Sequence, residues 1–360
     1  MAADSHFCPH VVIYPFPGFV DSEKRKSVQV LSDFFNSISV PFVDLSLEES
    51  PGQYIKDYFD PDIIFYPQPY NRLYRCDLDS IFFEDRLLSY VPYATNTINE
   101  EWLFNERLCN VAWRLYYSTE EDRLNAKRYS LNKGRNVRIV GNVVADSFLS
   151  GKYKSPWKDT GNKRKRIIWA PHYSITSGGP LYRSSFLSLH SIMLEIADRF
   201  QSDIQFAFKP HPRLATELYK HPEWGKERTD AYYSKWASGL NTQLETGSYI
   251  DLFMTSDAMI HDSVSFTAEY HFSLNPVLFT TADVERDKKQ LNGLGKKAID
   301  AHYLGFSAQE IISFIDNVVL NGNDSMLEKR SEFFNKYLLP PGRDTVAGAI
   351  HQDIVESIWG

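Results

Sequence analysis

The feature of this sequence that most constrains its fold is a repeated alternation of short apolar runs with longer amphipathic stretches. The short runs are rich in Val, Ile, Phe and Tyr and are typical of buried strands, whereas the longer stretches have helical spacing. This order predicts parallel strands that are joined by crossover helices. The chain is therefore expected to have an α/β fold.

The alternation occurs once in each half of the chain, and a polar segment at 151–165 separates the halves. In the first half, strands are expected at Val11–Phe16, Phe42–Leu45, Asp62–Tyr66, Leu87–Val91, Trp113–Tyr117 and Asn136–Val140, and helices at Asp21–Ser39 and Glu120–Tyr129. In the second half, strands are expected at Arg166–Ala170, Asp203–Phe208, Ala258–His261 and Pro276–Phe279, and helices at Ser184–Phe200, Tyr249–Thr255, Ser307–Leu320, Ser325–Leu338 and Thr345–Trp359. The polar segment contains Pro156, Gly161 and several basic residues, so it is predicted to be an interdomain linker.

This organisation predicts two Rossmann-like domains, since 360 residues exceed one ordinary core. We place the domains at 1–150 and 151–338. A stop at Pro340-Pro341-Gly342 precedes the last helical stretch, and residues 339–360 are predicted to pack back onto the first domain. Open parallel sheets bind ligands beyond the carboxyl ends of their strands, so a cleft between the domains is the expected site.

The balance of charges argues against one class of partner. The net charge of −7 comes from 39 basic and 46 acidic residues, which does not favour nucleic-acid binding by a basic surface. The one dense basic run, at 163–166, is read as a solvated edge of the linker. The alternative is an anchor for anionic lipid or for an anionic acceptor.

The sequence also bears on the compartment. No run approaches the roughly 18 apolar residues that span a bilayer, and the N-terminus lacks the pattern of a secretory signal. Cys8, Cys76 and Cys109 have no CxxC spacing, which fits a reducing environment. The chain is therefore expected in the cytoplasm, and peripheral contact with the inner face of the membrane is left open.

The most informative motif, KPHPR at 209–213, follows the strand expected at Asp203–Phe208. Two prolines stiffen the turn around His211. Lys209 supplies a point charge for phosphate, Arg213 can bind phosphate bidentately, and His211 can donate or shuttle a proton. The motif predicts a phosphate site, and the alternative is an exposed polar loop.

A second motif, HDSVS at 261–265, joins an apolar strand to a helical pattern. Asp262 or Ser263 is a natural N-cap, and the free N–H groups of the first turn with the hydroxyls of Ser263 and Ser265 would form an anion site. The alternative is plain helix capping, which needs only one of these residues. Glu269 lies four residues after Ser265 on the same helical face, where it could bind donor hydroxyls or pair with a surface cation.

A third loop, Trp169–Pro180, follows the first strand of the second half and is rich in hydroxyl groups and glycine. His172 is a candidate catalytic residue here, with Tyr173 and Ser174 as candidate donor-binding neighbours, and the alternative is a structural loop. In the first half, structural roles are favoured for Tyr14–Gly18, for Tyr90–Ala94 and for Gly141-Asn142 with Asp146.

Several familiar site patterns are missing. The sequence has no HExxH frame, no GxSxG elbow, no GxxxxGK[ST] loop and no GxGxxG. These absences count against a zinc centre, a hydrolase of the elbow type, a P-loop NTPase and a Rossmann dehydrogenase. We therefore expect no metal and no cofactor.

Taken in order, these motifs resemble those of the CDP-glycerol glycerophosphotransferase family, the teichoic-acid and capsule polymer enzymes. The APH at 170–172 looks like the first loop of that family's C-domain, KPHP at 209–212 its K-x-H-P motif, and IHDSVSFTAEY at 260–270 its I-T-D-Y-S-S segment. The sequence at 140–146 is similar to the family's G-x-x-x-x-D at the end of the N-domain. The resemblance covers the second half and this junction. It implies a GT-B type architecture, with an acceptor-side first domain and a donor-binding second domain.

The resemblance also implies roles for single residues. His211 takes the place of the family's second functional histidine, Ser265 that of the second serine at the phosphate-binding helix start, and Glu269 that of the acidic residue. The family's N-domain His-Gly motif, which supplies the presumed base, is not found, and Tyr90–Ala94 stands near its place.

Two further departures lie in the second half, where Val264 replaces the first serine of the pair and His261 replaces a threonine. The donor can therefore differ from that of the family. A CDP-alditol is the default, and a nucleotide sugar or phosphoribosyl diphosphate is the alternative. The base is not identified, and His172 and His261 are candidates.

These expectations describe a metal-independent transferase that moves a glycerophosphate, polyol-phosphate or glycosyl group from a diphosphate donor to a hydroxyl of a cell-surface or lipid-linked glycan. Ser263–Ser265, Lys209 and Arg213 would hold the diphosphate, and His211 would orient or protonate the leaving phosphate. One alternative is a nucleotide-sugar or phosphoribosyl-diphosphate dependent glycosyltransferase of the same fold. The other is a sugar- or nucleotide-binding module that has lost its base.

Overall fold

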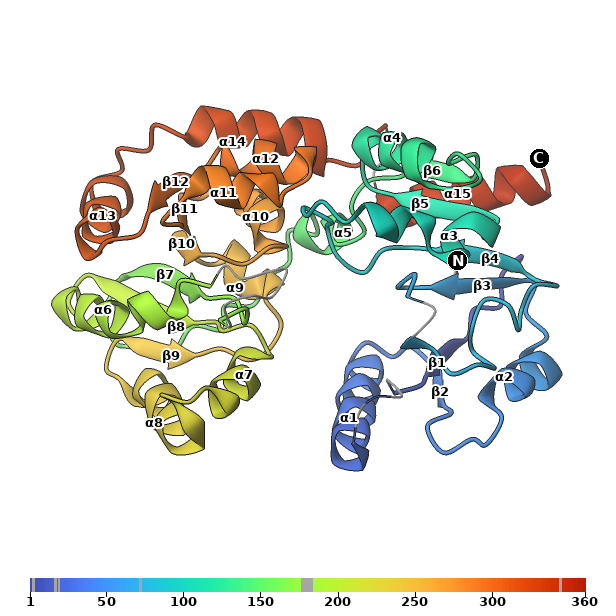
Figure 1. Ribbon diagram of the computed structural model, residues 1–360, viewed down its shortest axis with the longest axis horizontal. Coiled ribbons are helices and arrows are strands. Elements are labelled where there is room, and N and C mark those ends of the chain that lie inside the picture. Colours follow the sequence, from blue (N-terminus) through green and yellow to red (C-terminus); the bar gives the residue numbers. More distant parts are fainter. Residues whose placement is uncertain (2–3, 16–17, 19, 71–72, 176–183, 343–344) are drawn as a thin grey trace. The chain divides into compact units, whose positions relative to one another are not determined.

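The structure is a computed structural model that describes residues 1–360 except 2–3, 16–17, 19, 71–72, 176–183 and 343–344. It divides into two compact units, both drawn in Figure 1. Unit 1 comprises Met1–Tyr93, Glu100–Val143 and Pro341–Gly360, and unit 2 comprises Ala94–Asn99 and Val144–Pro340.

Unit 1 is built on parallel strands, as predicted. Its strands are β1 (Val11–Ile13), β2 (Phe42–Asp44), β3 (Ile63–Tyr66), β4 (Leu87–Tyr90), β5 (Arg114–Tyr117) and β6 (Val137–Ile139). Its helices are α1 (Asp21–Ser37), α2 (Pro51–Tyr54), α3 (Arg107–Val111), α4 (Glu120–Tyr129) and α15 (Val346–Ile358), with shorter helical turns at Ile55–Phe59 and Glu101–Asn105. β1 pairs with β2, and β3-β4-β5-β6 form a second sheet in that order.

The last helix, α15, packs with unit 1, as the sequence predicts. Thr345 caps its first turn, where the Thr345 Oγ1 accepts a hydrogen bond of 2.9 Å from Gly348 N. The Asp353 carboxylate on α15 accepts hydrogen bonds from Arg114 Nε at 2.8 Å, Arg138 Nε at 3.0 Å and the Tyr116 hydroxyl at 3.0 Å. The end of the chain is thereby fastened to β5 and β6.

Unit 2 contains a single six-stranded parallel sheet among its described residues. Its strands are β7 (Lys165–Ala170), β8 (Ile204–Phe208), β9 (Thr242–Leu244), β10 (Ala258–His261), β11 (Val277–Thr280) and β12 (Tyr303–Gly305). Its helices are α5 (Ala145–Phe148), α6 (Phe186–Arg199), α7 (Leu214–Lys220), α8 (Gly225–Ser238), α9 (Ile250–Met254), α10 (Phe266–Glu269), α11 (Val284–Lys289), α12 (Gly293–Ile299), α13 (Ala308–Ser313) and α14 (Leu327–Phe333). A 3₁₀-helix follows α10 at Tyr270–Ser273, and π-helical turns follow α13 at Phe314–Leu320 and α14 at Phe334–Leu338.

The order of these strands is β12-β11-β10-β7-β8-β9. After β7 the chain adds β8 and then β9 on one side of β7. It then crosses to the other side and adds β10, β11 and β12 in that order. This is the doubly wound Rossmann order, and its switch point lies between β7 and β10. Ligands of such sheets bind at the carboxyl ends of the two strands that flank the switch point.

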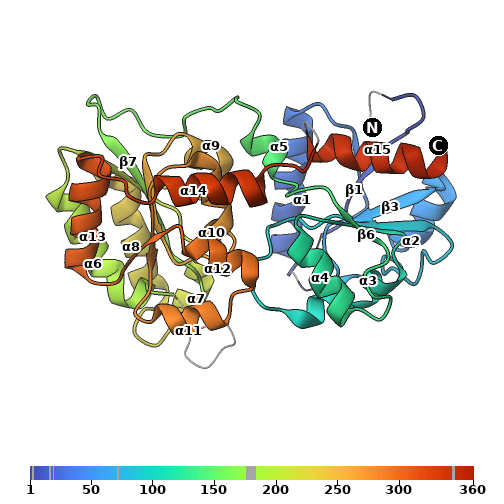
Figure 2. The same ribbon diagram turned by 90° about the horizontal axis from the view of Figure 1, so that it is seen from above.

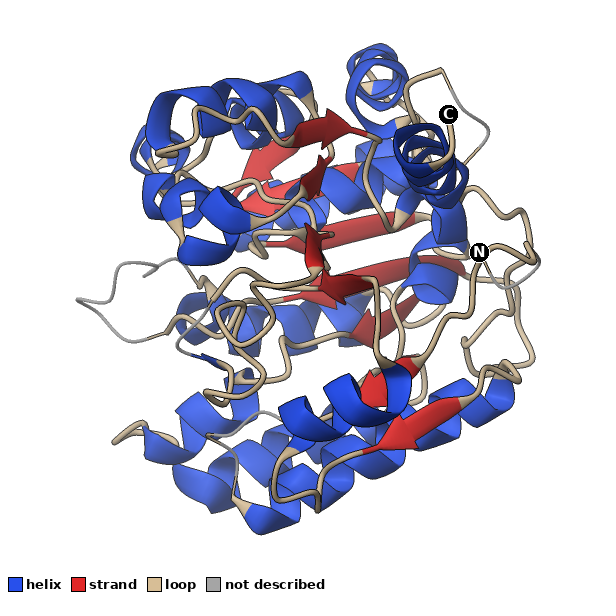
Figure 3. Cartoon of the chain, turned by 90° about the vertical axis from the view of Figure 1, so that its right-hand side faces the viewer, coloured by secondary structure: helices blue, strands red, loops and turns tan. Residues whose placement is uncertain are grey.

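Helices cover both faces of this sheet (Figure 2), which explains why its inner strands are mostly apolar. Figure 3 draws the helices of the chain in blue and its strands in red. Every residue of β8, β10 and β11 is buried. Phe186 and Met193 of α6 and Trp236 of α8 join Trp169 and Phe208 in the main core. The strands at the switch point are therefore held rigidly in place.

The ends of most predicted elements are shifted by one or two residues. Most of the elements that were not predicted lie in the region 214–305, namely β9, β12, α7, α8, α11 and α12, and the short helices α2, α3 and α5 were not predicted either. β9 is a three-residue strand that reads Thr-Gln-Leu and lacks an apolar run. The segment expected as a linker lies along unit 2, where Trp157 is buried and Lys158 N donates to Gln243 Oε1 at 2.8 Å.

One short piece of the first half, Ala94–Asn99, belongs to unit 2, and we call it the strap. Its backbone is tied to the α11–α12 connection: Asn292 N donates to Thr97 O at 3.1 Å and Asn99 N donates to Gln290 O at 2.8 Å. Asn292 Nδ2 also donates to Asn96 O at 2.9 Å. The sequence did not indicate this arrangement.

Candidate anion-binding site

The loops that follow β7 and β10 meet because these two strands pair, with Ala170 opposite His261. The Asp262 carboxylate joins the loops: its Oδ1 accepts a 2.5 Å hydrogen bond from His172 N, and its Oδ2 accepts bonds from Ser185 N at 2.5 Å and Ser185 Oγ at 2.7 Å. Asp262 is 1% exposed. It therefore acts as an internal brace between β10, the loop after β7 and the start of α6.

The expectation that Asp262 or Ser263 caps the following helix is wrong. α10 begins at Phe266, the residue before it is Ser265, and no side chain caps it. Burial raises the pKa of the Asp262 carboxyl, and the hydrogen bonds from Ser185 and His172 oppose that rise. The local pattern suggested a cap, but partners 77 and 90 residues away engage the carboxylate.

Four of the predicted site residues gather where the loops after β7 and β8 lie together. The His211 backbone N–H donates to Pro171 O at 3.0 Å. The ring centroids of His172 and His211 are 5.1 Å apart, and those of Tyr173 and His211 are 4.5 Å apart. The Arg213 guanidinium lies over the Tyr173 ring at 4.3 Å. Two imidazoles, one phenol ring and one guanidinium thus form a single cluster.

Lys209 enters the same edge of the sheet from the end of β8. Its side chain is buried, and Nζ donates to Gly247 O at 2.8 Å, the one hydrogen bond that the described residues give this ammonium. Burial lowers the pKa of Lys209, which the Glu245 carboxylate partly opposes. An ammonium has three N–H donors, so Lys209 retains the capacity to bind an anion.

The electrostatic environment of His211 keeps its ring neutral at physiological pH. Burial, followed by the charges of Arg213 and Lys209, lowers the pKa of His211 to about 4. The same cations create a positive field at the carboxyl edge of β8, which attracts anions. Ser174, the neighbouring candidate, places its Oγ 2.8 Å from His172 Nδ1.

His261 lies below this surface rather than on it. It is fully buried, its Nδ1 accepts the N–H of Ser263 at 3.1 Å, and its Nε2 lies 3.1 Å from His302 Nε2. The His302 Nδ1–H donates to Ala298 O at 2.8 Å. Ser263 N–H is thus used inside the protein, contrary to the expectation that it is free for an anion.

Burial lowers the pKa of each histidine in this interior group, to about 3 for His302 and well below the usual range for His261 and His271. The His271 Nε2–H donates to the same Ala298 carbonyl at 3.1 Å. Ser263 is also buried, whereas Ser265 is partly exposed at the start of α10. Ser265 is therefore the hydroxyl of the second motif that a ligand can reach.

Glu269 is inside unit 2 and binds the strap. Its Oε1 accepts hydrogen bonds from Thr95 N at 3.2 Å and Thr95 Oγ1 at 3.0 Å, and the side chain is 1% exposed. Burial raises the pKa of Glu269, and the hydrogen bonds from Thr95 oppose that rise. The alternative of a surface cation as its partner is wrong. Thr97 Oγ1 donates to Val264 O at 2.8 Å, so the strap also holds the residue before Ser265.

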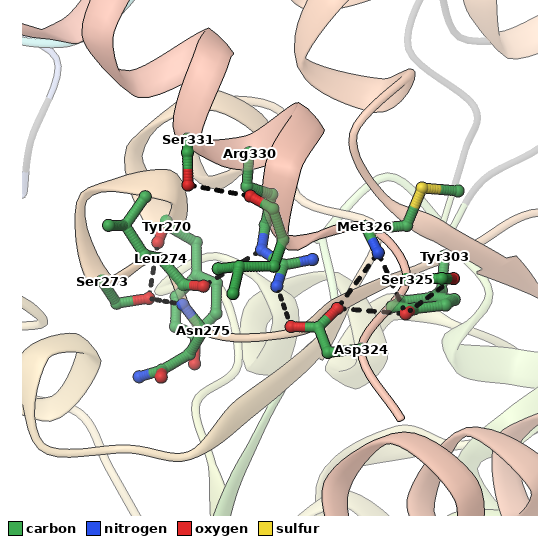
Figure 4. A network of polar contacts seen from close by, with 11 residues as sticks. Tyr270, Ser273, Leu274, Asn275, Tyr303, Asp324, Ser325, Met326, Arg330 and Ser331 are labelled. Carbon is green, nitrogen blue, oxygen red and sulfur yellow. Dashed lines mark hydrogen bonds and ion pairs between the residues drawn. The ribbon is translucent and has the colours of Figure 1, made fainter. Parts of the chain in front are cut away.

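A buried arginine supports α10 from the other end (Figure 4). Arg330 of α14 is completely buried, and its Nε donates to Leu274 O at 3.1 Å, just after the turn that follows α10. Asp324 neutralises this arginine through an ion pair and accepts the Tyr303 hydroxyl at 3.0 Å. Leu274 has a φ of 58°, a conformation that L side chains rarely adopt, and the bond from Arg330 holds its carbonyl in place.

Some candidate loops lie partly beyond the residues that the structure describes. Of Trp169–Pro180 the part 176–180 is outside the described residues, as are Phe16 and Pro17 of Tyr14–Gly18. In Tyr90–Ala94, Tyr90 is buried and Tyr93 is 62% exposed. Asn142 is buried, after Gly141 with a φ of 96°.

The described residues include no group of three or more His, Cys, Asp or Glu side chains that could hold a metal ion. They also include no helix that is long and apolar enough to cross a membrane.

The sequence analysis missed four residues that shape the site: Ser185, Thr280, Thr95 and His302. Ser185 Oγ lies 2.7 Å from Thr280 Oγ1, which connects the Asp262 brace to the end of β11. The serine before the apolar helix was a usable signal for Ser185, because hydroxyl residues favour helix starts. No local sequence pattern marks Thr280, Thr95 or His302 as part of the site.

Solved structures share this fold. The UDP-GlcNAc 2-epimerase from Neisseria meningitidis bound to UDP-GlcNAc superposes with a TM-score of 0.59 at 17% identity, covering 91% of this chain and 89% of that chain. Another UDP-N-acetylglucosamine 2-epimerase gives 0.60 at 15% identity, covering 99% and 89%. The wall teichoic acid polymerase TagF gives 0.60 at 12% identity, covering 97% and 90%.

Comparison with protein-family models and with curated proteins gave no match. At these identities the structural likeness shows the fold, which is that of the GT-B type proteins. The chain thus has an α/β fold of parallel-sheet, Rossmann-like units, as the sequence predicts.

Proposed function

We propose that unit 2 binds the diphosphate of an activated donor at its switch point, and that the protein transfers a group from this donor to a hydroxyl. The observation that carries the proposal is the convergence of Lys209, His211 and Arg213 with His172 at the carboxyl edge of β7 and β8. β7 flanks the switch point, beside which doubly wound sheets bind nucleotides. The cluster has cationic and neutral N–H donors, which suits a diphosphate.

Each residue has a role in the proposal. Lys209 and Arg213 provide positive charge to the diphosphate, and His211 and His172 provide oriented hydrogen bonds. Ser265 extends the site on the β10 side. Charge that develops on the departing phosphate is stabilised by donors that are already in place, which lowers the barrier without reorganisation. The proposed reaction uses no metal.

The donor and acceptor remain proposals. Resemblance of the motifs favours a CDP-alditol and transfer of a glycerophosphate or polyol phosphate to a glycan. The fold neighbours include UDP-GlcNAc 2-epimerases whose structures were solved with UDP-GlcNAc or UDP, which supports a nucleotide sugar as the alternative donor. A cytoplasmic location and contact with a lipid-linked glycan at the membrane stay predictions.

A donor panel tests the proposal. The full chain is incubated with CDP-glycerol, CDP-ribitol, UDP- and GDP-sugars, CMP-sugars and phosphoribosyl diphosphate, with and without a glycan extract, and released nucleotide is measured by chromatography. Release of CMP from one CDP-alditol that depends on the extract supports polyol-phosphate transfer. Conversion of UDP-GlcNAc without an acceptor indicates an epimerase, and binding of a donor without turnover indicates a binding module.

The residue-level test compares His211→Ala with His221→Ala, a histidine at the end of α7 outside the cluster. We expect His211→Ala to lower turnover by roughly 10²-fold to 10³-fold, as for loss of one preformed donor, while circular dichroism is unchanged. His221→Ala should retain activity. Full activity of a folded His211→Ala variant would remove His211 from the proposal.

A further inference from the structure

Three histidines at the carboxyl ends of parallel strands of unit 2 share one local geometry. In each, the backbone N–H two residues later donates to Nδ1: Ser174 N to His172 at 3.3 Å, Arg213 N to His211 at 3.1 Å and Ser263 N to His261 at 3.1 Å. A backbone N–H can only donate, so each Nδ1 must be the acceptor. In the neutral ring the proton is therefore on Nε2.

The orientation of the rings is fixed by further contacts. Ser174 Oγ lies 2.8 Å from His172 Nδ1, and because that nitrogen is an acceptor the hydroxyl is the donor. The His211 ring is held between the Tyr173 and His172 rings, and its backbone is tied to Pro171. In His261 the Nε2–H is already used, because the His302 Nδ1–H donates to Ala298 O and leaves His302 Nε2 as the acceptor.

The charges around His211 favour the neutral ring. Lys209 and Arg213 come from its own loop, and the loop after β7 contributes His172 and Tyr173. The carboxylates nearby are occupied or distant: Glu217 pairs with Arg213 at 3.5 Å, and Glu245 acts on Lys209. Burial and the two cations lower the pKa of His211 to about 4.

We propose that His211 is a fixed Nε2–H donor to an oxyanion of the phosphate type, and that none of the three strand-end histidines is the base for the attacking hydroxyl. A base needs an unprotonated nitrogen that faces its substrate. The unprotonated nitrogen of each ring, Nδ1, instead faces the backbone. The identity of the ligand rests on the proposed function, whereas the tautomers are properties of the free protein.

The first test measures the tautomers directly. Full-length protein labelled with ¹⁵N-histidine is studied by long-range ¹H–¹⁵N correlation at pH 7, and the His172 and His211 signals are assigned by their loss in His172→Gln and His211→Gln. We expect the pattern of a protonated Nε2 and an unprotonated Nδ1 for both rings. A protonated Nδ1, in the neutral Nδ1–H tautomer or in the imidazolium, overturns the proposal whether or not the protein has transferase activity.

The second test separates a donor from a base. Gln places its amide nitrogen near the position of Nε2, and Asn near that of Nδ1, and neither can take up a proton. We expect His211→Gln to retain about tenfold more activity and pyrophosphate affinity than His211→Asn and His211→Ala. Equal losses in all three, together with a wild-type kcat/KM that falls with a histidine titration between pH 7 and 5, would show a base and overturn the proposal.

The outcomes distinguish this inference from the proposed function. Inorganic pyrophosphate reports on the oxyanion site without turnover, and we expect it to shift the Nε2–H resonance of His211. No turnover of any donor, with the expected tautomers and a pyrophosphate shift, would contradict the transferase proposal and support the donor role. Turnover of a donor by a protein whose rings carry the proton on Nδ1 would support the transferase proposal and contradict the donor role.

Discussion

A single buried carboxylate, Asp262, holds together the residues around the proposed anion site. It accepts hydrogen bonds from His172 N, Ser185 N and Ser185 Oγ, and no surface exposure compensates if one of them is lost. An amide in its place offers one oxygen, and its NH₂ group would face a backbone N–H. One buried donor would then be unsatisfied, which costs roughly 1–3 kcal/mol.

We therefore predict that Asp262→Asn lowers the free energy of unfolding by about 1–3 kcal/mol, and that it also lowers activity because His172 loses its anchor. Urea unfolding followed by circular dichroism measures the first effect. The matched control is Asp300→Asn, which removes a surface ion pair with Lys288 and should change stability little. Equal stability of Asp262→Asn and wild type would show that the brace does not form.

At the scale of elements, the strap determines the surroundings of α10. Gly295 makes its close approach possible, because a Cβ there would lie 2.3 Å from Thr97 O. The atom in the way belongs to the backbone and cannot rotate aside. The same strap binds Glu269 and the Val264 carbonyl, so a shift of the strap is transmitted to the start of α10.

Gly295→Ala should consequently destabilise the protein, although alanine is the better helix former by about 1 kcal/mol. Hydrogen exchange at 94–99 should rise while exchange in β7 and β8 stays slow. Lys296→Ala, at an exposed neighbouring position of α12, is the control that should be neutral or stabilising. A more stable Gly295→Ala with unchanged exchange would contradict the close approach.

The buried histidines of β10, of the turn after α10 and of the α12–β12 connection predict sensitivity to acid. Their pKa values are lower in the folded protein than the ordinary value of about 6.5. Below pH 6.5 the unfolded chain binds protons at these histidines that the folded chain excludes. The free energy of unfolding is therefore at its full value above pH 6.5 and decreases as the pH falls below it.

His302→Asn tests this linkage, since Asn keeps an N–H donor for Ala298 but cannot titrate. Below pH 6.5 we expect the wild-type free energy of unfolding to fall more steeply than that of the variant, by up to about 1.4 kcal/mol per pH unit. Urea unfolding at pH 7.5, 6 and 5 measures both slopes, and the value at pH 7.5 isolates any loss of packing. Parallel slopes would count against a buried neutral His302.

The elements themselves were predictable to different degrees. β8 is apolar except for Gln205, β10 is apolar up to His261, and both strands were predicted. β9 has no such apolar run and is a strand because it pairs with β8. The Gln243 Oε1 accepts a hydrogen bond from Lys158 N, and the Thr242 Oγ1 donates to Trp236 O. The motif at 261–265 was correctly placed at the end of a strand, but its Asp262 was misread as a cap because its true partners are distant in sequence.

At the scale of the whole molecule, α15 connects the end of the chain to unit 1. Asp353 is the common acceptor for Arg114 and Arg138, which are 239 and 215 residues away. The side chain of Arg114 is 13% exposed, so loss of its counter-ion would leave a poorly solvated charge. Apolar contacts of Ile350 and Ile354 add to the attachment.

Asp353→Ala should loosen unit 1 alone. We expect faster hydrogen exchange in β5, β6 and α15, and unchanged exchange in β7, β8 and β10, because the lost contacts all lie within unit 1. Glu356→Ala, on the exposed side of the same helix, should leave every segment unchanged. Uniform loosening of both units would show that α15 is not specific to unit 1.

The sequence by itself determined the α/β class, the parallel strands and the strand-end positions of Lys209, His211 and His172, because apolar runs and the turns that end them are local properties of the chain. Only the tertiary structure decided which of these side chains meet. The pairing of Ala170 with His261, the brace of Asp262 and the strap on Glu269 join residues that are 77 to 174 positions apart. Such contacts depend on how the whole chain folds, and no local pattern encodes them.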